Sequence, residues 1–210
     1  MTMPCKSSPG KSSLGKALLT LMLGAVLATG GCGSHQAGSA EQPPLAGAAI
    51  GGQFTLVDKT GKTVRWTDMT GHYRIVYFGY TFCPDACPTD MMVAMRGLDI
   101  YARQHPQKAA NIVPLFISID PARDTPQVVG EFAAHFSPRL VGLTGSPQQV
   151  EQAAKAFAAY YARGKETSGG YLMDHSRIAY LMAPNGDPIT MLPVDKGAEA
   201  VAADLDKWVK

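Results

Sequence analysis

Two cysteines separated by three residues are the first candidates for chemistry in this sequence of 210 residues. Cys83 and Cys87 stand in the segment 78–88, which reads FGYTFCPDACP. Each cysteine precedes a proline, which restricts the backbone of the residue before it and suits the first turn of a helix. We therefore expect both sulfurs at a helix N-terminus, with Pro88 as the first helical residue and Cys87 just outside. The helix dipole and free backbone N–H groups favour thiolates there.

This pair is compatible with a structural disulfide, a redox pair or a metal site. A disulfide would close a very small loop, and it would add little stability to a chain long enough to build a large core. Redox loops usually have two residues between the cysteines, and Cys83 and Cys87 have three, but a redox pair remains an alternative. Two thiolates suit Cu(I), and an imidazole as third ligand would also admit Cu(II) and Zn(II).

The elements that must position these sulfurs follow from the hydrophobic pattern. Nearly continuous apolar runs over 74–80 and 112–119 predict strands that are buried on both faces, and 140–143 predicts a short third strand. Helical spacing and helix-start signals predict helices over 88–104, from 126 onward, 146–161 and 198–209. Hairpins are predicted for 54–57 with 63–66, and for 177–183 with 188–192 around an Asn-Gly turn. The fold class is therefore α/β, with a thioredoxin-like mixed sheet, helices on both faces and an N-terminal β-hairpin.

His175 is the histidine best placed to be the third ligand. The other four lie in a low-complexity segment, a turn and two helix ends, at His35, His72, His105 and His135. We predict the segment 169–176 as a loop that enters the last hairpin, and in a thioredoxin-like sheet this loop approaches the N-terminus of the first helix. The carboxylate of Asp174 either orients His175 by a hydrogen bond to the second nitrogen of the imidazole ring or is an ordinary loop carboxylate.

The N-terminal segment has the pattern of an export signal. Three lysines and no acid occur in the first 16 residues, followed by an apolar run over 17–28, small residues and Cys32. The apolar run is shorter than the roughly 20 residues that span a bilayer as a helix. A cysteine directly after small residues resembles a bacterial lipoprotein signal, which predicts lipidation of Cys32. A plain cleaved signal or an uncleaved anchor remains open, because Thr29 stands where leucine is expected.

Composition divides the chain into three parts. We predict an export signal of lipoprotein type over 1–32, a flexible tether rich in Gly, Ala, Ser and Pro over 33–48, and a thioredoxin-like domain over 49–210 that contains the candidate metal ligands. The 19 basic and 17 acidic residues nearly balance and form no long basic stripe, which excludes nucleic acid as a partner. We expect the protein to be exported and tethered to a membrane, with its domain in the periplasm or otherwise outside the cytoplasmic membrane.

Three motifs together resemble the SCO/SenC family of copper chaperones. They are GYTFCPDACP at 79–88, SIDPARDTP at 118–126, and DHS at 174–176 followed by Tyr180-Leu181. The resemblance implies a thioredoxin fold, Cu(I) or Cu(II) bound by Cys83, Cys87 and His175, and delivery to the dinuclear copper site of cytochrome c oxidase subunit II. It also implies a role in assembly of that oxidase, an upstream copper donor and a membrane anchor. A thiol-disulfide oxidoreductase that reduces the cysteines of that site, or a redox or copper sensor, remains an alternative.

Two aspartates in the second motif are secondary candidates. Asp120 and Asp124 match the D-x-x-x-D pattern of the family, which is associated with metal handling or partner contact. The alternative is turn and helix-entry chemistry around the neighbouring prolines.

Peroxiredoxins offer another comparison, because residues 87–90 read CPTD. Their reactive cysteine has threonine three residues before it, and Pro84 and Tyr80 stand at those positions here. No catalytic residue is predicted beyond the redox pair.

Overall fold

The computed structural model describes residues 41–167 and 170–210. The predicted export signal, Cys32 and the tether up to residue 40 lie outside the described residues. The helices are α1 (Ala86–Gln104), α2 (Pro106–Ala110), α3 (Pro126–Phe136), α4 (Pro147–Ala156) and α5 (Ala198–Trp208), with 3-10 turns η1 (Trp66–Met69) and η2 (Val194–Lys196). The strands are β1 (Thr55–Val57), β2 (Thr63–Arg65), β3 (Tyr73–Gly79), β4 (Ile112–Ser118), β5 (Val141–Leu143), β6 (Tyr161–Thr167), β7 (Gly170–His175), β8 (Ala179–Met182) and β9 (Pro188–Leu192).

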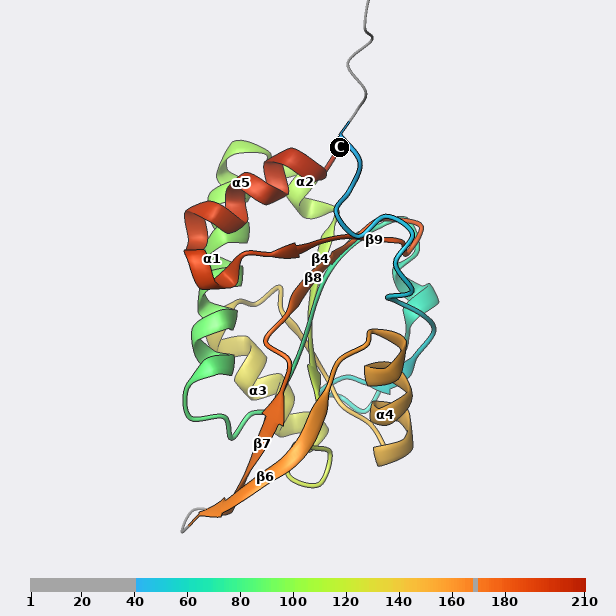
Figure 1. Cartoon of the computed structure of the whole chain (residues 1–210), viewed down its shortest axis with the longest axis vertical. Helices are drawn as coiled ribbons and strands as arrows, with labels where there is room; N and C mark the ends of the chain where they lie inside the picture. Colours follow the sequence, from blue (N-terminus) through green and yellow to red (C-terminus); the bar gives the residue numbers. More distant parts are fainter. Residues whose placement is uncertain (1–40, 168–169) are drawn as a thin grey trace, which may run out of the picture. The chain divides into compact units, whose positions relative to one another are not determined.

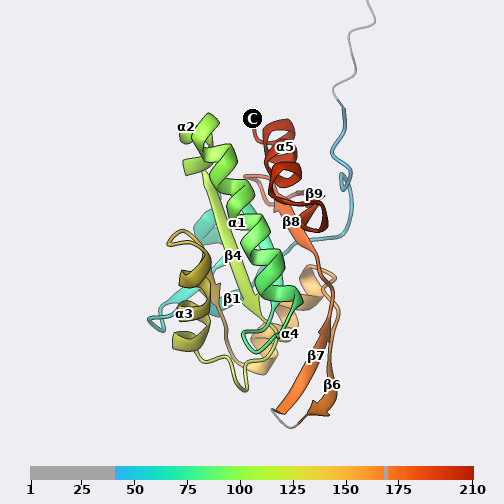
Figure 2. The ribbon, with the colours of Figure 1, turned by 90° about the vertical axis from the view of Figure 1, so that its left-hand side faces the viewer.

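A five-stranded mixed sheet with the order β5-β4-β3-β8-β9 forms the centre of the domain. β3, β4 and β5 are parallel, whereas β8 runs antiparallel to β3 and β9 antiparallel to β8. Helices α1, α3 and α5 cover one face and α4 covers the other (Figure 1), and Figure 2 shows the first face from the front. Every residue of β3 is buried, as its apolar run predicts. The predicted thioredoxin-like sheet with helices on both faces is confirmed.

The N-terminal hairpin of β1 and β2 is also confirmed, with Thr55 opposite Arg65 and Val57 opposite Thr63. Aromatic rings anchor it to the domain. The ring of Trp66 lies 5.5 Å from that of Phe54 and 5.3 Å from that of Phe157, and Phe157 in turn lies 5.5 Å from Phe78 of β3. Large buried aromatic side chains of this kind are major contributors to core stability. The hairpin therefore packs on the same strand that leads to the cysteines.

Helix starts follow the predicted capping residues in two cases and differ in the third. Thr125 accepts a hydrogen bond from the backbone N–H of Val128, and Ser146 accepts one from that of Gln149. Helix α1, in contrast, begins at Ala86, so Cys87 lies inside its first turn and the prediction that it lies just outside is wrong. A proline is tolerated at the third position of α1, because first-turn N–H groups have no acceptor within the helix.

The chain between α4 and β8 departs most from the sequence-based prediction. The helix predicted over 146–161 ends at Ala156, and Ala158 has a left-handed backbone with φ of 51°. Residues 161–167 and 170–175, the latter predicted as part of a loop, instead form the antiparallel hairpin of β6 and β7. This hairpin extends beyond the helices at one end of the domain (Figures 1 and 2). Its strands lack apolar alternation, which hid them from periodicity arguments.

The domain begins at Glu41, within the segment predicted as tether. The backbone N–H of Leu45 donates to the carbonyl of Ile189 on the edge strand β9, and Leu45 packs against the core. The Lys207 ammonium also pairs with the Glu41 carboxylate at 2.7 Å. One apolar side chain and a free strand edge are enough to dock residues 41–48. Within the described part of the chain, the helices do not combine the length and apolar character needed to cross a bilayer.

Candidate metal centre

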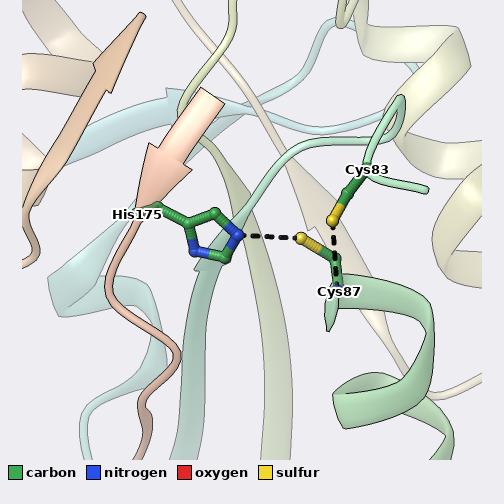
Figure 3. Close-up of side chains that lie close together, drawn as sticks. All are labelled: Cys83, Cys87 and His175. Atoms are coloured by element: carbon green, nitrogen blue, oxygen red, sulfur yellow. Dashed lines mark hydrogen bonds between the residues drawn. The ribbon is translucent and has the colours of Figure 1, made fainter. Parts of the chain in front are cut away.

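The side chains of Cys83, Cys87 and His175 converge at one end of the central sheet (Figure 3). Their three potential ligand atoms all lie within 4.8 Å of one another. The Cys87 sulfur is 3.2 Å from Nε2 of His175, and the Cys87 backbone N–H donates to the Cys83 sulfur at 3.4 Å. Both cysteines are free thiols. Two sulfurs and one imidazole nitrogen in this arrangement can hold a soft or borderline metal ion.

The two cysteines are placed by the junction of β3 with α1. Gly79, the last residue of β3, allows the buried Cys87 sulfur to approach the strand. A Cβ atom on Gly79 would lie 2.9 Å from that sulfur and 2.9 Å from Cε2 of Phe116, closer than van der Waals contact allows. Glycine is therefore required here because of a close approach of neighbouring atoms rather than because of its backbone angles.

The two thiols differ in protonation. A hydrogen bond with the Cys87 side chain is the main cause that lowers the pKa of Cys83 far below that of a free thiol, and a contact with His175 adds to it. The same hydrogen bond, together with burial, raises the pKa of Cys87. In the metal-free protein at neutral pH, Cys83 is thus a half-buried thiolate and Cys87 a buried thiol. Metal binding through both sulfurs must displace the proton of Cys87.

The imidazole of His175 is oriented by the backbone. Its Nδ1 lies 2.9 Å from the carbonyl oxygen of Ser176, and since a carbonyl can only accept, Nδ1 carries the hydrogen. Nε2 is the ring nitrogen that faces the cysteines, 3.2 Å from the Cys87 sulfur, and it is the atom through which His175 would bind a metal. The rings of Tyr77 and Tyr80 meet the imidazole edge-on, at 6.2 and 5.9 Å between centroids. Asp174 is exposed, and the contact made by Nδ1 of His175 is with the Ser176 carbonyl, so an orienting role for this carboxylate stays a prediction.

Asp124 holds the loop that carries the cysteines. Its fully buried carboxylate accepts hydrogen bonds from the Thr81 backbone at 3.1 Å, the Thr81 hydroxyl at 2.6 Å and the Ser118 hydroxyl at 2.6 Å. Burial raises the pKa of Asp124. These bonds join the end of β4 to the segment two residues before Cys83. Asp124 therefore acts on the site through the cysteine loop.

Asp120 connects the second motif with the hairpin that carries His175. Its carboxylate accepts from Nε of Arg123 at 2.5 Å and from the Tyr171 hydroxyl of β7 at 2.7 Å. The Arg123 guanidinium also stacks over the rings of Tyr171 at 3.7 Å and Phe82 at 4.8 Å. Among the described residues, the metal-ligating group comprises the two cysteines and His175 without Asp120, Asp124 or Asp174. Asp120 and Asp124 make contacts within the domain, and their predicted roles in metal handling or partner contact stay predictions.

A second set of residues near the site, Tyr77, Asp90 and Arg177, was not predicted from the sequence. Asp90 of α1 is buried and lies between the Tyr77 hydroxyl and the Arg177 guanidinium. One signal could have found it, because a carboxylate between Cys87 and Ala94 interrupts the apolar stripe of a predicted helix. Arg177 carries no comparable local signal, since its contact to Asp90 spans 87 positions, and Tyr77 is one residue of an apolar strand.

Comparisons with known proteins find one family that matches most of this chain. The family model described as SCO1/SenC matches residues 42–210. Protein SenC of Rhodobacter capsulatus is 41% identical over 157 residues, which cover 75% of this chain and 69% of that protein. The mitochondrial SCO1 homolog 1 of Arabidopsis thaliana is 41% identical over 144 residues, 69% of this chain and 42% of that protein. The matched region thus spans less than half of the plant relative.

Solved structures of homologues have the same fold. Copper-bound ScoI of Arabidopsis thaliana superposes with a TM-score of 0.71 at 35% identity, covering 75% of this chain and 96% of that one. Copper-bound ScoI of Bradyrhizobium japonicum gives 0.68 at 33% identity, covering 76% and 99%. BsSco, described as a member of the Sco family of cytochrome c oxidase assembly proteins, gives 0.53 at 24% identity, covering 76% and 94%. The family model and the relatives agree over nearly all of the described domain, so this chain belongs to the SCO1/SenC family.

Proposed function

We propose that this protein is a copper metallochaperone that holds copper with Cys83, Cys87 and His175 and passes it to the dinuclear copper site of cytochrome c oxidase subunit II. One observation carries the proposal. Three ligand atoms of types suited to copper lie within 4.8 Å of one another, in a chain whose homologues have been solved with copper bound. BsSco, which has this fold, is described as belonging to a family of cytochrome c oxidase assembly proteins, which supports the choice of partner.

The ligand set suits a cargo metal that must later leave. Two thiolates satisfy Cu(I), and the His175 imidazole extends the site to Cu(II). Cys83 is only partly buried whereas Cys87 is buried, so a thiol of the acceptor can reach copper at Cys83 before Cys87 is displaced. Copper moves by ligand exchange with no net redox change. Cys87 regains its proton as it releases the metal, whereas Cys83 stays a thiolate at neutral pH.

The N-terminal segment supplies the location in this proposal. An export signal followed by a lipidated Cys32 would place the domain outside the cytoplasmic membrane and tether it there, where an upstream donor would load it with copper. The supporting observation is the signal pattern of residues 1–32. Radiolabelled fatty acid should be incorporated by the full chain in bacterial cells and not by the Cys32→Ser variant. Equal labelling of both would exclude lipidation at this residue.

A titration of the reduced protein with Cu(I) and with Cu(II) tests the ligand assignment. We expect one copper ion per chain, with sulfur-to-Cu(II) charge-transfer absorption. Cys83→Ala, Cys87→Ala and His175→Ala should each lower affinity and change that absorption. His105→Ala is the matched control, because His105 pairs with Asp206 away from the cluster. Unchanged stoichiometry and spectra in the three ligand variants would show that the assignment is wrong.

Delivery is tested separately with the copper-binding domain of subunit II as acceptor. The copper-loaded protein should lose its copper to the reduced, metal-free acceptor, and the acceptor should gain the absorption of its dinuclear centre. The copper-loaded His105→Ala protein should transfer at the same rate. Retention of copper by the chaperone at a large excess of acceptor would contradict delivery and leave only a copper-binding role.

A second candidate function is the reduction of disulfides in the same acceptor. The lowered pKa of the half-exposed Cys83 favours it, because the thiolate is the attacking species. Cys83 would attack the acceptor disulfide and form a mixed disulfide, and Cys87 would then attack Cys83 and release the second thiol. The two cysteines give two electrons to the acceptor, whose thiols take one proton from Cys87 and one from solvent, and a Cys83–Cys87 disulfide remains. His175→Ala separates the two functions, since it should abolish copper transfer and retain disulfide reduction.

A further inference from the structure

Asp90 lies one helical turn after Cys87 and is unusually buried for a carboxylate, with 1% of the residue exposed. Its oxygens accept three hydrogen bonds. The Tyr77 hydroxyl donates at 2.8 Å, and the Arg177 guanidinium donates from Nε at 3.1 Å and from Nη2 at 2.7 Å, one bond to each oxygen. Such a paired arrangement is what permits a carboxylate to remain in the interior. We refer to Tyr77, Asp90 and Arg177 as the brace.

The brace connects the two segments that supply the proposed ligands. Asp90 is in the first turns of α1, which contains Cys87, and Arg177 follows His175 by two residues in the connection from β7 to β8. Tyr77 contributes twice, because its hydroxyl bonds to Asp90 and its ring meets the imidazole of His175 edge-on. A two-pronged arginine-carboxylate contact fixes orientation as well as distance. The connection after His175 is therefore held at a defined position against α1.

We propose that Asp90 and Arg177 are positioning residues. They hold the His175 imidazole close enough to the two sulfurs for all three ligands to bind one copper ion, and they thereby favour the binding of Cu(II). This inference rests on the proposed copper site. Cys83 and Cys87 lie close together around the start of α1 and can bind Cu(I) between them, whereas the imidazole comes from a residue 88 positions after Cys87. Cu(II) needs the nitrogen ligand more than Cu(I) does. Displacement of His175 should therefore weaken Cu(II) binding selectively.

A purely structural ion pair would behave differently. If the contact served only to neutralise a buried carboxylate, its removal would lower the stability of the domain and would affect both copper oxidation states alike. A positioning role predicts a selective loss of Cu(II) and a local loosening of the segment around His175. The two roles are distinguished by comparing the two copper affinities within one variant.

Arg177→Ala is the main test, with Arg139→Ala as its matched control. Arg139 also makes buried contacts, to the carbonyl oxygens of Ala109 and Ile112, but at the opposite end of β4 from the site. In Arg177→Ala we expect Cu(II) affinity to fall about 10- to 100-fold with an altered charge-transfer spectrum, as for supporting residues at other metal sites. Cu(I) affinity should change less than about threefold. Arg139→Ala should leave both affinities unchanged.

Two further measurements keep the outcome decisive. Arg177→Lys retains the charge but cannot make both bonds, so it should show the same selectivity with a smaller loss, and it serves if Arg177→Ala does not fold. In the metal-free protein, amide hydrogen exchange over residues 171–178 should be about tenfold faster in Arg177→Ala than in wild type or Arg139→Ala.

Equal losses of Cu(I) and Cu(II) affinity, or unchanged exchange over 171–178, would overturn the positioning role. Failure of the wild-type protein to bind copper would instead contradict the proposed function. The exchange experiment would still decide whether the brace holds the His175 segment, because it uses the protein without metal.

Discussion

Cys83 and Cys87 lie where two elements of the central fold meet, β3 and α1, whereas His175 ends the separate two-stranded sheet of β6 and β7. The cysteine loop is held by one buried carboxylate, Asp124, through three hydrogen bonds. The contacts that hold the hairpin include two at separate points. Tyr171 on β7 bonds to Asp120, and Arg177 beyond its end bonds to Asp90.

Because of this difference, the cysteine half and the histidine half of the site depend on different kinds of contact. The sulfurs are brought together by neighbouring residues on a rigid junction, so their geometry depends on local packing. The imidazole is brought to them by contacts between distant segments, so its position can change without disturbing the sulfurs. Substitutions in the packing of the cysteine loop should therefore change the stability of the whole domain and the affinities for both Cu(I) and Cu(II). Substitutions along the hairpin should act locally. The predictions below test that division.

The largest effect is expected for Asp124→Ala. The substitution leaves the Thr81 N–H and the hydroxyls of Thr81 and Ser118 without their buried acceptor, and each hydrogen bond to a charged group contributes about 1.5–3 kcal/mol. We expect the free energy of unfolding to fall by about 3–5 kcal/mol, measured by urea denaturation of the metal-free protein. Asp58→Ala is the control, because Asp58 also accepts several hydrogen bonds but lies in an exposed turn. A loss no larger than that of the control would contradict the role of Asp124.

Gly79→Ala tests the packing beneath the Cys87 sulfur. The new methyl group must displace that sulfur or the Phe116 ring, and overpacking of this kind costs about 1–3 kcal/mol. Affinities for Cu(I) and Cu(II) should both fall, because the displaced sulfur is a proposed ligand for each. Gly97→Ala is matched in crowding, since its methyl group would meet Val201 at 2.6 Å between α1 and α5. It should lose stability and keep copper binding, and equal copper affinities in the two variants would refute the argument.

The cysteine half of the site could be predicted from the sequence because its signals are local. The apolar run of β3, the two prolines and the periodicity of α1 all lie within a short stretch around Cys83 and Cys87. The error there was small and concerned only the first turn of α1. The central strands β3 and β4 could be predicted for the same reason, since they are buried and have apolar sequences, and β8 and β9 from the Asn-Gly turn between them.

The histidine half could not be predicted in the same way. β6 reads YARGKET, with a glycine and several charged residues and no apolar alternation. Cross-strand stacking supports it, with the Arg163 guanidinium 3.9 Å from the Tyr171 ring, and a periodicity argument does not detect such a contact. His175 was identified only through its expected place in the fold and the family resemblance. The contact between Asp90 and Arg177 joins residues 87 positions apart and leaves no local pattern.

Tyr171→Phe should have a smaller, local effect on the hairpin. It removes the hydroxyl that donates to Asp120 and keeps the ring over which Arg123 stacks. We expect a loss of about 1 kcal/mol in unfolding free energy, faster hydrogen exchange confined to β6 and β7, and unchanged Cu(I) affinity. Tyr160→Phe is the control, an exposed tyrosine just before β6. Exchange that accelerates throughout α1 and β3 would show that the hairpin and the loop are not independent.

The smallest effect should be that of His175→Ala on the Cys83 thiolate. The Cys87 side chain is the main cause of the lowered pKa of Cys83, and the contact with His175 is a lesser one. Cys87→Ala should therefore raise the pKa of Cys83 more than His175→Ala does, as measured by the ultraviolet absorption of the thiolate or by the rate of alkylation as a function of pH.

The same lowered pKa makes one contribution to the pH dependence of stability in the metal-free protein. Because the pKa of Cys83 is lower in the folded protein than the roughly 8.5 of a free thiol, its thiolate stabilises the fold. That contribution is fully present above the free-thiol pKa and is lost as the pH falls through the folded value. His175→Ala should reduce this pH dependence slightly, and Cys87→Ala should reduce it strongly. The reverse order would mean that the thiolate depends on the distant hairpin, and the two halves of the site would then be coupled before any metal binds.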